Sequence, residues 1–116
     1  FNDGDMQRDF TYIDDIVAGV IACLNKSPVS DRPAPLHRIY NIGNNHSEPL
    51  MKFISVIEET VGISAQIEFL PMQLGDVKAT YADISGATRD FGFIPSTPID
   101  KGLPKLITWY REYYGV

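Results

Sequence analysis

The sequence predicts an α/β domain of the α+β kind, in which about four helices cover a small mixed sheet. Three observations point to this class. Short runs with two-residue alternation are interspersed with longer runs of helical period along the 116 residues. Hydrophobic residues make up 44% of the chain and charged residues 22%, the composition of one soluble globular domain with one core. The strands are few and short, which suits an accessory domain better than a full doubly wound sheet.

The first expected strand runs from Arg8 to Ile13, where Phe10 and Tyr12 alternate with polar residues as in a half-buried strand. The run from Asn2 to Gly4 contains Asn, Asp and Gly, the residues of a tight hairpin turn. This turn would pair the strand with another one that ends near Phe1.

A helix is expected directly after this strand, from about Asp15 to Lys26. Asp14 or Asp15 would cap it by accepting hydrogen bonds from the first free amides. Capping also explains this adjacent acidic pair better than catalysis does, because neighbours in sequence do not share a helix face. Apolar residues surround most of the helix, so we expect it to pack against something that this chain does not contain.

The middle of the chain is expected to form a loop and two further short strands. Three prolines indicate a surface loop from Ser27 to His37. Arg38 to Ile42 reads as a strand closed by the turn at Gly43 to Asn45, and Ala65 to Leu70 reads as another strand.

The clearest helix lies between these two strands, from Leu50 to Val61, with apolar residues at i, i+3, i+4, i+7 and i+11. Ser47 or Glu48 would cap it, and Pro49 suits its first turn. Gly62 suits its end, because glycine readily adopts the left-handed conformation that terminates helices.

Two helices are expected in the last third of the chain. Asp83 would cap a short helix that reaches about Phe91 and ends at Gly92. A longer helix should begin near Pro98, but Pro104 lacks an amide and should kink it or delay its start.

The totals exclude several classes of protein. A net charge of -5 argues against a nucleic-acid partner, which would need a basic surface. The longest apolar run, Ile16 to Leu24, is about half of what a bilayer requires, so no membrane partner is expected. Cys23 is the only cysteine, which suggests a reduced intracellular protein and a cytoplasmic location. Because the chain starts at Phe1 within a strand-like pattern, we suspect an excised portion of a longer polypeptide.

Arg8 is the first candidate binding residue. A guanidinium held on a rigid strand offers five donors in a planar fork and suits a carboxylate or phosphate. The alternative is a surface arginine that pairs with Asp9 or Asp5.

The loop from Leu70 to Tyr81 contains two more candidates. Gln73 and Asp76 would offer an amide and a carboxylate to hydroxyls or to a base edge. The alternative is an ordinary turn in which Asp76 bonds to its own backbone.

Catalytic, cofactor-binding and metal-binding residues are not expected in this chain. No tyrosine is followed four residues later by lysine, and Gly43 is not part of a glycine-rich pyrophosphate turn. His37 and His46 have no further ligand at metal-binding spacing.

Four segments together carry a resemblance to a known family: Arg8 to Asp15, Tyr40 to Gly43, Leu70 to Asp83 and Trp109 to Arg111. The whole chain resembles the carboxyl-terminal part of an extended short-chain dehydrogenase/reductase acting on nucleotide sugars, closest to the UDP-glucuronate 4-epimerase group. The resemblance implies that residues 1–116 form a nucleotide-sugar-binding domain. It also implies an amino-terminal Rossmann domain, absent here, that holds NAD and the catalytic residues.

The same resemblance implies roles for three residues. Arg8 would contact the diphosphate, and Asp76 would contact the ribose hydroxyls. Gln73 stands where the glucuronate group usually has glutamine and galactose-type epimerases usually have arginine, which favours a uronate substrate.

The expected reaction of the intact enzyme is the interconversion of UDP-glucuronate and UDP-galacturonate at C4 through a 4-keto intermediate. This chain alone would bind the UDP-sugar without turnover, and the parent enzyme would be a homodimer. Two alternatives stay open at this stage. One is a nucleotide-sugar decarboxylase or 4,6-dehydratase of the same family, and the other is a noncatalytic ligand-binding or protein-binding module.

Overall fold

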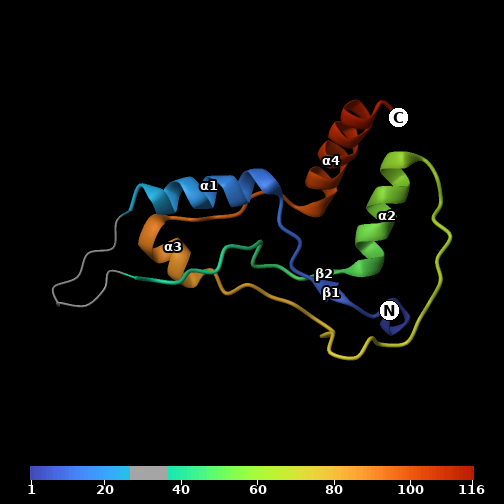
Figure 1. Cartoon of the computed structure of the whole chain (residues 1–116), viewed down its shortest axis with the longest axis horizontal. Helices are drawn as coiled ribbons and strands as arrows, with labels where there is room; N and C mark the ends of the chain where they lie inside the picture. Colours follow the sequence, from blue (N-terminus) through green and yellow to red (C-terminus); the bar gives the residue numbers. More distant parts are fainter. Residues whose placement is uncertain (27–36) are drawn as a thin grey trace.

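The structure is a computed structural model that describes residues 1–26 and 37–116, so the loop expected from Ser27 to His37 lies almost wholly outside the described residues. Figure 1 shows helices over a very small sheet, which confirms the predicted fold class. The elements are a 3-10 turn η1 (Asn2–Gly4), β1 (Gln7–Arg8), α1 (Ile13–Leu24), β2 (Glu48–Pro49), α2 (Leu50–Val61), α3 (Ser85–Phe91) and α4 (Ile99–Tyr114).

The helices form two pairs with the sheet between them. Helix α1 packs against α3, and helix α2 packs against α4. In Figure 1 the two strands lie below and between these pairs, and the chain after α2 sweeps around to reach the far side of β1. The sheet therefore ties together two halves that otherwise have separate cores.

The sheet has two antiparallel strands with one isolated parallel bridge beside it, and β1 is shorter and paired differently from the predicted strand. β1 runs antiparallel to β2, with Gln7 opposite Pro49 and Arg8 opposite Glu48, and Gln7 forms an isolated parallel bridge with Ala79. Beyond Arg8, no further ladder pairing is present in the described residues, so the strand ends there.

The predicted hairpin is wrong. Asn2, Asp3 and Gly4 all have positive φ angles and form the η1 turn. The amide of Met6 then bonds back to the Gly4 carbonyl, so the turn closes on itself and does not return the chain to a neighbouring strand.

The other two predicted strands are also wrong. Neither Arg38 to Ile42 nor Ala65 to Leu70 forms a ladder with any described residue. The first segment instead packs Tyr40 and Ile42 against the core beside α3. The second lies exposed along its whole length, so no neighbouring strand pairs with its alternating residues.

Helix α2 has the predicted bounds, and Gly62 ends it with φ at 79°. The predicted caps are wrong, because Pro49 precedes the helix and no side chain caps it. The Ser47 hydroxyl donates to the Thr80 carbonyl, while the carboxylate of Glu48 accepts from the Lys52 ammonium at 3.1 Å. Ser47 thus binds another segment and Glu48 binds a side chain of α2, and neither caps the first turn of the helix.

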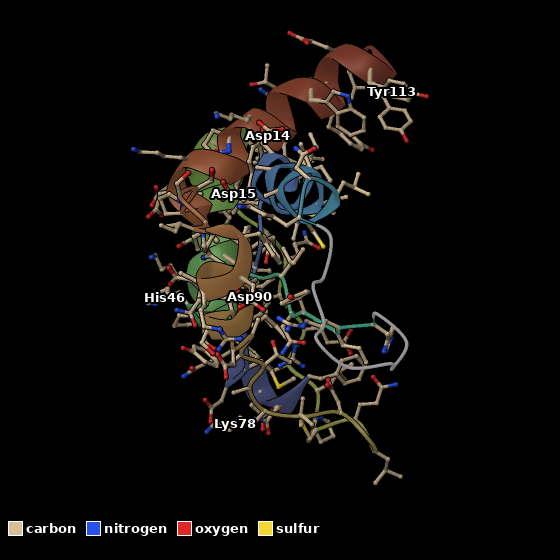
Figure 2. The ribbon with its side chains drawn as sticks, turned by 90° about the vertical axis from the view of Figure 1, so that its left-hand side faces the viewer. Asp14, Asp15, His46, Lys78, Asp90 and Tyr113 are labelled. Carbon is tan, nitrogen blue, oxygen red and sulfur yellow. The ribbon has the colours of Figure 1, made fainter. Side chains whose placement is uncertain are left out.

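Helix α1 begins at Ile13, two residues earlier than expected, and neither Asp14 nor Asp15 caps it. The carboxylate of Asp15 is buried and accepts hydrogen bonds from the amides of Ser96 and Thr97, at 3.2 and 2.9 Å. Figure 2 marks this pair of acids at the start of α1. Asp15 thus joins the start of α1 to the segment that leads into α4.

Helix α3 follows the prediction closely. The carboxylate of Asp83 accepts from the Ser85 amide at 2.9 Å, and this hydrogen bond lowers the pKa of Asp83. The helix ends at Phe91, and Gly92 follows in the left-handed conformation. The N-cap residue is Ile84, without a side-chain cap, so Asp83 bonds to the first helical amide from one position before the N-cap that was predicted for it. This local bond and the terminal glycine are both readable from sequence, which explains the agreement on the bounds.

Helix α4 runs from Ile99 through Pro104 to Tyr114, so the predicted delay of its start is wrong. The amides of Lys101 and Gly102 bond to the Pro98 carbonyl and establish the first turn before the proline is reached. Pro104 then removes only one hydrogen bond of the helix, which the flanking turns tolerate.

Among the described residues, the interior contains two small apolar clusters, whereas one core was expected. The first joins α2 to α4 through Val56, Ile99 and Leu103, with the rings of Phe10 and Phe53 stacked at 4.1 Å beside them. The second surrounds α3 and is formed by Ile84, Ala87 and Phe93, packed against Tyr40, Ile42, Ala82 and Phe91.

Helix α1 remains open to solvent over much of its surface, as expected from its all-round apolar pattern. Its glycine, Gly19, faces Phe93, and a Cβ atom there would lie 2.9 Å from that ring. The exposed apolar residues of α1 are Ile13, Val17, Val20, Ile21 and Leu24.

The Cα radius of gyration is 17.9 Å, whereas a compact domain of this length has about 13 Å. Within the described residues, no helix combines the length and apolar character needed to cross a membrane.

Candidate functional site

Arg8 lies at the end of β1 with its guanidinium held in place. Nη1 donates to the backbone carbonyls of Gln7 and Lys78, at 2.8 and 3.3 Å. Nη2 donates to the carboxylate of Asp76 at 2.8 Å. Because the carbonyl of Lys78 also pairs with the Gln7 amide, the same backbone contact anchors both the strand and the arginine side chain.

The guanidinium is held in place but keeps hydrogen-bond donors for a ligand. These bonds occupy three of its five donors, and the other two have no protein partner in the described part of the chain. The side chains of Arg8 and Asp76 remain 25% and 33% exposed. A charged ligand can therefore reach donors whose orientation is already set.

Asp76 forms the local turn that was one alternative from the sequence, and it also pairs with Arg8. Its Oδ1 accepts from Arg8 and also from the amide of Val77 at 2.7 Å, so the local turn is present. No partner for Oδ2 is present among the described residues. One carboxylate oxygen thus orients the arginine, and the other is left for a further donor.

Gln73 is joined to this pair through the backbone. Its carbonyl accepts from the Asp76 amide at 3.2 Å, and Gly75 has φ at 84° within the same turn. Its side chain is exposed and makes no hydrogen bond to any described residue. The structure therefore brings Arg8 and Asp76 into contact, while the position of the Gln73 amide is not fixed by them.

Neither of the acids considered as alternative partners binds Arg8. Asp5 forms an ion pair with Lys78, whose position beside the amino-terminal segment is marked in Figure 2. The carboxylate of Asp9 accepts hydrogen bonds from backbone amides and does not bind Arg8. The ion pair of Arg8 is instead made with a residue 68 positions along the chain.

Asp9 was not among the candidate binding residues, although it is the most heavily bonded carboxylate near Arg8. Its oxygens accept from the amides of Asn44, Asn45 and Ala82, at 2.8, 3.1 and 2.8 Å. The sequence carries only a weak signal for this role, because the donors are backbone groups on two distant segments.

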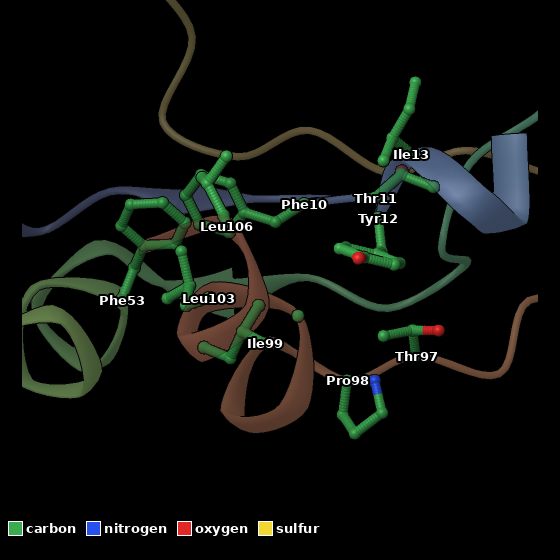
Figure 3. A pocket seen from close by; sticks show the side chains of 11 residues that line it. Phe10, Thr11, Tyr12, Ile13, Phe53, Thr97, Pro98, Ile99, Leu103 and Leu106 are labelled. Atoms are coloured by element: carbon green, nitrogen blue, oxygen red, sulfur yellow. The ribbon is translucent and has the colours of Figure 1, made fainter. Parts of the chain in front are cut away.

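An apolar pocket lies apart from these residues. It has a volume of about 290 Å³ and is bordered by Phe10, Phe53 and the first turns of α4 (Figure 3). None of Arg8, Gln73 and Asp76 lines it. A charged sugar nucleotide would find few hydrogen-bond partners there, so the polar surface around Arg8 is the better candidate.

A second charged cluster surrounds Asp90 on α3, marked in Figure 2. Its carboxylate accepts from the guanidinium of Arg89 and the hydroxyl of Tyr40, both at 2.8 Å, and from Arg38 at 3.0 Å. Arg89 first and then Tyr40 lower the pKa of Asp90 to about 2. This cluster ties the 38–40 segment to α3.

Among the described residues, no group of three acids, histidines or cysteines could hold a metal ion.

Known proteins resemble this chain closely over its whole length. It is 41% identical to the protein CapI of Staphylococcus aureus, covering 98% of this chain and 37% of that protein. It is 38% identical to UDP-glucuronate 4-epimerase 2 of Arabidopsis thaliana, covering 97% of this chain and 28% of that protein. No protein-family model matches the chain.

A solved structure shows the same relationship in three dimensions. The UDP-glucuronic acid 4-epimerase of Bacillus cereus, in complex with UDP-glucuronic acid and NAD, superposes with a TM-score of 0.80 at 32% identity. The match covers 98% of this chain and 35% of that enzyme. The chain thus spans only about a third of the length of the relatives that it matches.

In fold and sequence, the chain is similar to the carboxyl-terminal part of extended short-chain dehydrogenase/reductases of the nucleotide-sugar epimerase family. Within that family, the group that it resembles is the UDP-glucuronate 4-epimerases.

Proposed function

We propose that residues 1–116 are the nucleotide-sugar-binding domain of a longer NAD-dependent epimerase that interconverts UDP-glucuronate and UDP-galacturonate at C4. The observation that carries this proposal is the ion pair between Arg8 and Asp76, at 2.8 Å. Both residues were selected from the sequence as parts of one binding site, and they meet across a long separation in the chain.

Arg8 is the proposed diphosphate anchor. Its fixed cation offers two remaining donors, and a planar guanidinium suits the oxygens of a phosphate group. The net charge of the chain is -5, so a long-range positive field does not attract the ligand. Recognition therefore depends on the local geometry at Arg8.

Asp76 and Gln73 are the proposed contacts to the rest of the ligand. The second carboxylate oxygen of Asp76 can accept from a ribose hydroxyl while the first keeps its bond to Arg8. The exposed amide of Gln73 can donate to and accept from the same ligand. The side chain is neutral, which distinguishes this site from a family site with arginine at that position.

NAD does not fit the residues of this chain. Gly43 is followed by Asn44, Asn45 and His46, so the glycine-rich turn that approaches a pyrophosphate is absent. The remainder of the parent protein is the proposed holder of NAD, which supplies the redox chemistry at C4 when bound. The part of this chain is to hold the UDP end of the substrate, and alone it should show no turnover.

The exposed apolar face of α1 agrees with this division. The five apolar residues of that face, from Ile13 to Leu24, would be covered by the remainder of the parent protein. A homodimeric parent and a cytoplasmic location complete the proposal, and neither depends on the geometry at Arg8.

The test uses the full-length protein that contains this segment. Incubation with UDP-glucuronate should yield UDP-galacturonate, and incubation with UDP-galacturonate should yield UDP-glucuronate. Both incubations should end at the same ratio of the two sugars. Release of carbon dioxide would instead identify a decarboxylase, and loss of water would identify a dehydratase. If the full-length sequence lacks a glycine-rich strand-to-helix turn and a tyrosine with lysine four residues later, the epimerase proposal fails and a noncatalytic module remains.

A further inference from the structure

We propose that Asp9 is a positioning residue for the nucleotide-sugar site, holding the segment that carries Asp76 in register with Arg8. This inference rests on the proposed function, because it concerns binding of the same ligand. It adds a residue whose side chain makes no hydrogen bond to Arg8 or Asp76 and acts through the backbone around them.

Asp9 joins three segments that are distant in sequence. It follows directly after β1, and its carboxylate accepts from the amides of Asn44 and Asn45 in one loop and of Ala82 in another. Its own amide donates to the hydroxyl of Thr80 at 3.1 Å. A single residue thus binds both loops to the end of the strand that holds Arg8.

The contact to the second loop continues a set of bonds that begins beside Asp76. The Gln7 amide donates to the Lys78 carbonyl at 2.9 Å, and the Thr80 amide donates to the Gln7 carbonyl at 3.2 Å. Asp9 adds the next two bonds, at Thr80 and Ala82. Because this stretch starts two residues after Asp76, its register against β1 sets the distance between Asp76 and Arg8.

The packing around Asp9 leaves little room for another arrangement. A Cβ atom on Gly43 would collide with the side chain of Ala82 and lie 3.2 Å from Oδ2 of Asp9. The glycine therefore permits the turn at Asn44 and Asn45 to approach the carboxylate. Asn45 has φ at 56°, a conformation that costs energy for most residues, and the hydrogen bond from its amide to Asp9 offsets part of that cost.

The chemistry of the contact requires a carboxylate. All three partners are N–H donors, so both oxygens must accept. In an Asp9→Asn variant one oxygen becomes an NH2 group, which faces a backbone donor and repels it. The substitution should loosen one of the two loops while keeping the size of the side chain.

Asp15 provides a matched control. Its carboxylate also accepts three hydrogen bonds, from the Ser96 amide and hydroxyl and from the Thr97 amide, and it lies in the first turn of α1. It ties α1 to the start of α4 and contacts no residue of the proposed site. An Asp15→Asn variant therefore reports what the loss of such a contact does to stability alone.

The experiment measures UDP binding to the full-length protein by calorimetry. Asp9→Asn should weaken UDP binding about tenfold, the scale of one charge-assisted hydrogen bond. Asp15→Asn should lower the melting temperature similarly while UDP affinity stays within about twofold. Gly43→Ala, which moves the same turn without removing an acceptor, should weaken UDP binding in the same direction and carries the test if Asp9→Asn does not fold.

A double variant separates positioning from general destabilisation. In the Asp76→Ala background, Asp9→Asn should change UDP affinity by less than about twofold, because the group that it positions is already gone. Additive effects would overturn the inference, as would unchanged UDP affinity in Asp9→Asn or in a folded Gly43→Ala protein. If Arg8→Ala itself leaves UDP affinity unchanged, the proposed site fails, and the inference about Asp9 fails with it. If Arg8→Ala weakens UDP binding but the Asp9 and Gly43 variants do not, the proposed binding site holds and Asp9 has no positioning role in it.

Discussion

The guanidinium of Arg8 and the carboxylate of Asp76 lie 2.8 Å apart, although 68 positions separate them in the chain. Two backbone carbonyls hold the arginine from the other side. A binding group that is already oriented loses less conformational freedom when its ligand arrives. The arrangement therefore suits a site that is built before the substrate enters.

The first prediction separates the role of Asp76 from that of Arg8. Asp76→Ala should weaken UDP binding by about 1.5 to 3 kcal/mol, the range for hydrogen bonds to a charged group. The same variant should bind 2′,3′-dideoxy-UDP nearly as well as the unmodified protein does, because the ribose donors are missing from that ligand. Calorimetry with both ligands measures the difference. Equal losses for the two ligands would show that Asp76 acts only by orienting Arg8.

The second prediction concerns acid stability through Asp90. Its folded-state pKa is about 2, below the ordinary 3.8, chiefly because Arg89 and Tyr40 donate to the charged carboxylate. The unfolded chain therefore takes up this proton first, so the stabilisation is present above about pH 3.8 and is lost as the pH falls toward 2.

Thermal melting across pH tests this directly. Asp90→Asn should melt below the unmodified chain at pH 7, and the gap between the two should narrow below about pH 4. A gap that stays constant down to about pH 2 would contradict the assigned ion pairs.

The third prediction contrasts two helical glycines. A Cβ atom on Gly19 would lie 2.9 Å from the ring of Phe93, so Gly19→Ala should destabilise the chain by about 1 to 3 kcal/mol through overpacking. On Gly86 the nearest atom, in Tyr40, is at 3.6 Å, an ordinary contact. Gly86→Ala should therefore stabilise α3 by roughly 0.5 to 1 kcal/mol, the usual helix-propensity gain. Denaturant unfolding of both variants measures the sign, and two changes of the same sign would argue against the packing described for α1 and α3.

The fourth prediction concerns the isolated 116-residue chain. Its α1 helix exposes five large apolar residues, with Leu24 at 77% and Ile13 at 61% exposure. Light scattering should therefore give a mass that rises with protein concentration. Ile21→Lys, which places a charge on that face, should reduce the rise, whereas Ile63→Lys, on an exposed residue outside α1, should not. A constant monomer mass in all three proteins would show that this face is not adhesive.

Local signals accounted for the helices that were predicted well. The apolar spacing of α2 and the glycines after α2 and α3 set the bounds of these elements through interactions within a few residues. The carboxylate of Asp83 is likewise two residues from its hydrogen-bond partner. Such contacts are encoded where they occur, so a sequence pattern is sufficient to find them.

The failures involve partners that lie far away in the chain. Ala65 to Leu70 alternates like a strand, but no described segment pairs with it, so the pattern has no structural consequence. Asp15 looked like a helix cap, yet its hydrogen-bond donors are at Ser96 and Thr97. Capping requires only a nearby helix start, and nothing local reveals that a distant loop competes for the same carboxylate.

The site falls between these two cases. Arg8 and Asp76 could be selected as candidates because their side chains have a chemistry suited to nucleotide sugars. Their contact could not be derived from spacing, since it depends on the loop after α2 returning to β1. Asp9 escaped notice for the same reason, because its three donors are backbone amides on two such loops.

The measurement that tests the central claim most directly is the affinity of the full-length protein for UDP, with and without the Arg8 side chain. Arg8→Ala should lose about 1.5 to 3 kcal/mol of binding free energy, and Arg8→Lys should recover only part of it, because lysine lacks the planar fork. Calorimetry gives both values, and an unchanged melting temperature confirms that each variant is folded. We predict that Arg8→Ala loses this binding free energy and that Arg8→Lys recovers part of it. Unchanged affinity for UDP in Arg8→Ala would contradict the assignment of Arg8 as the diphosphate anchor.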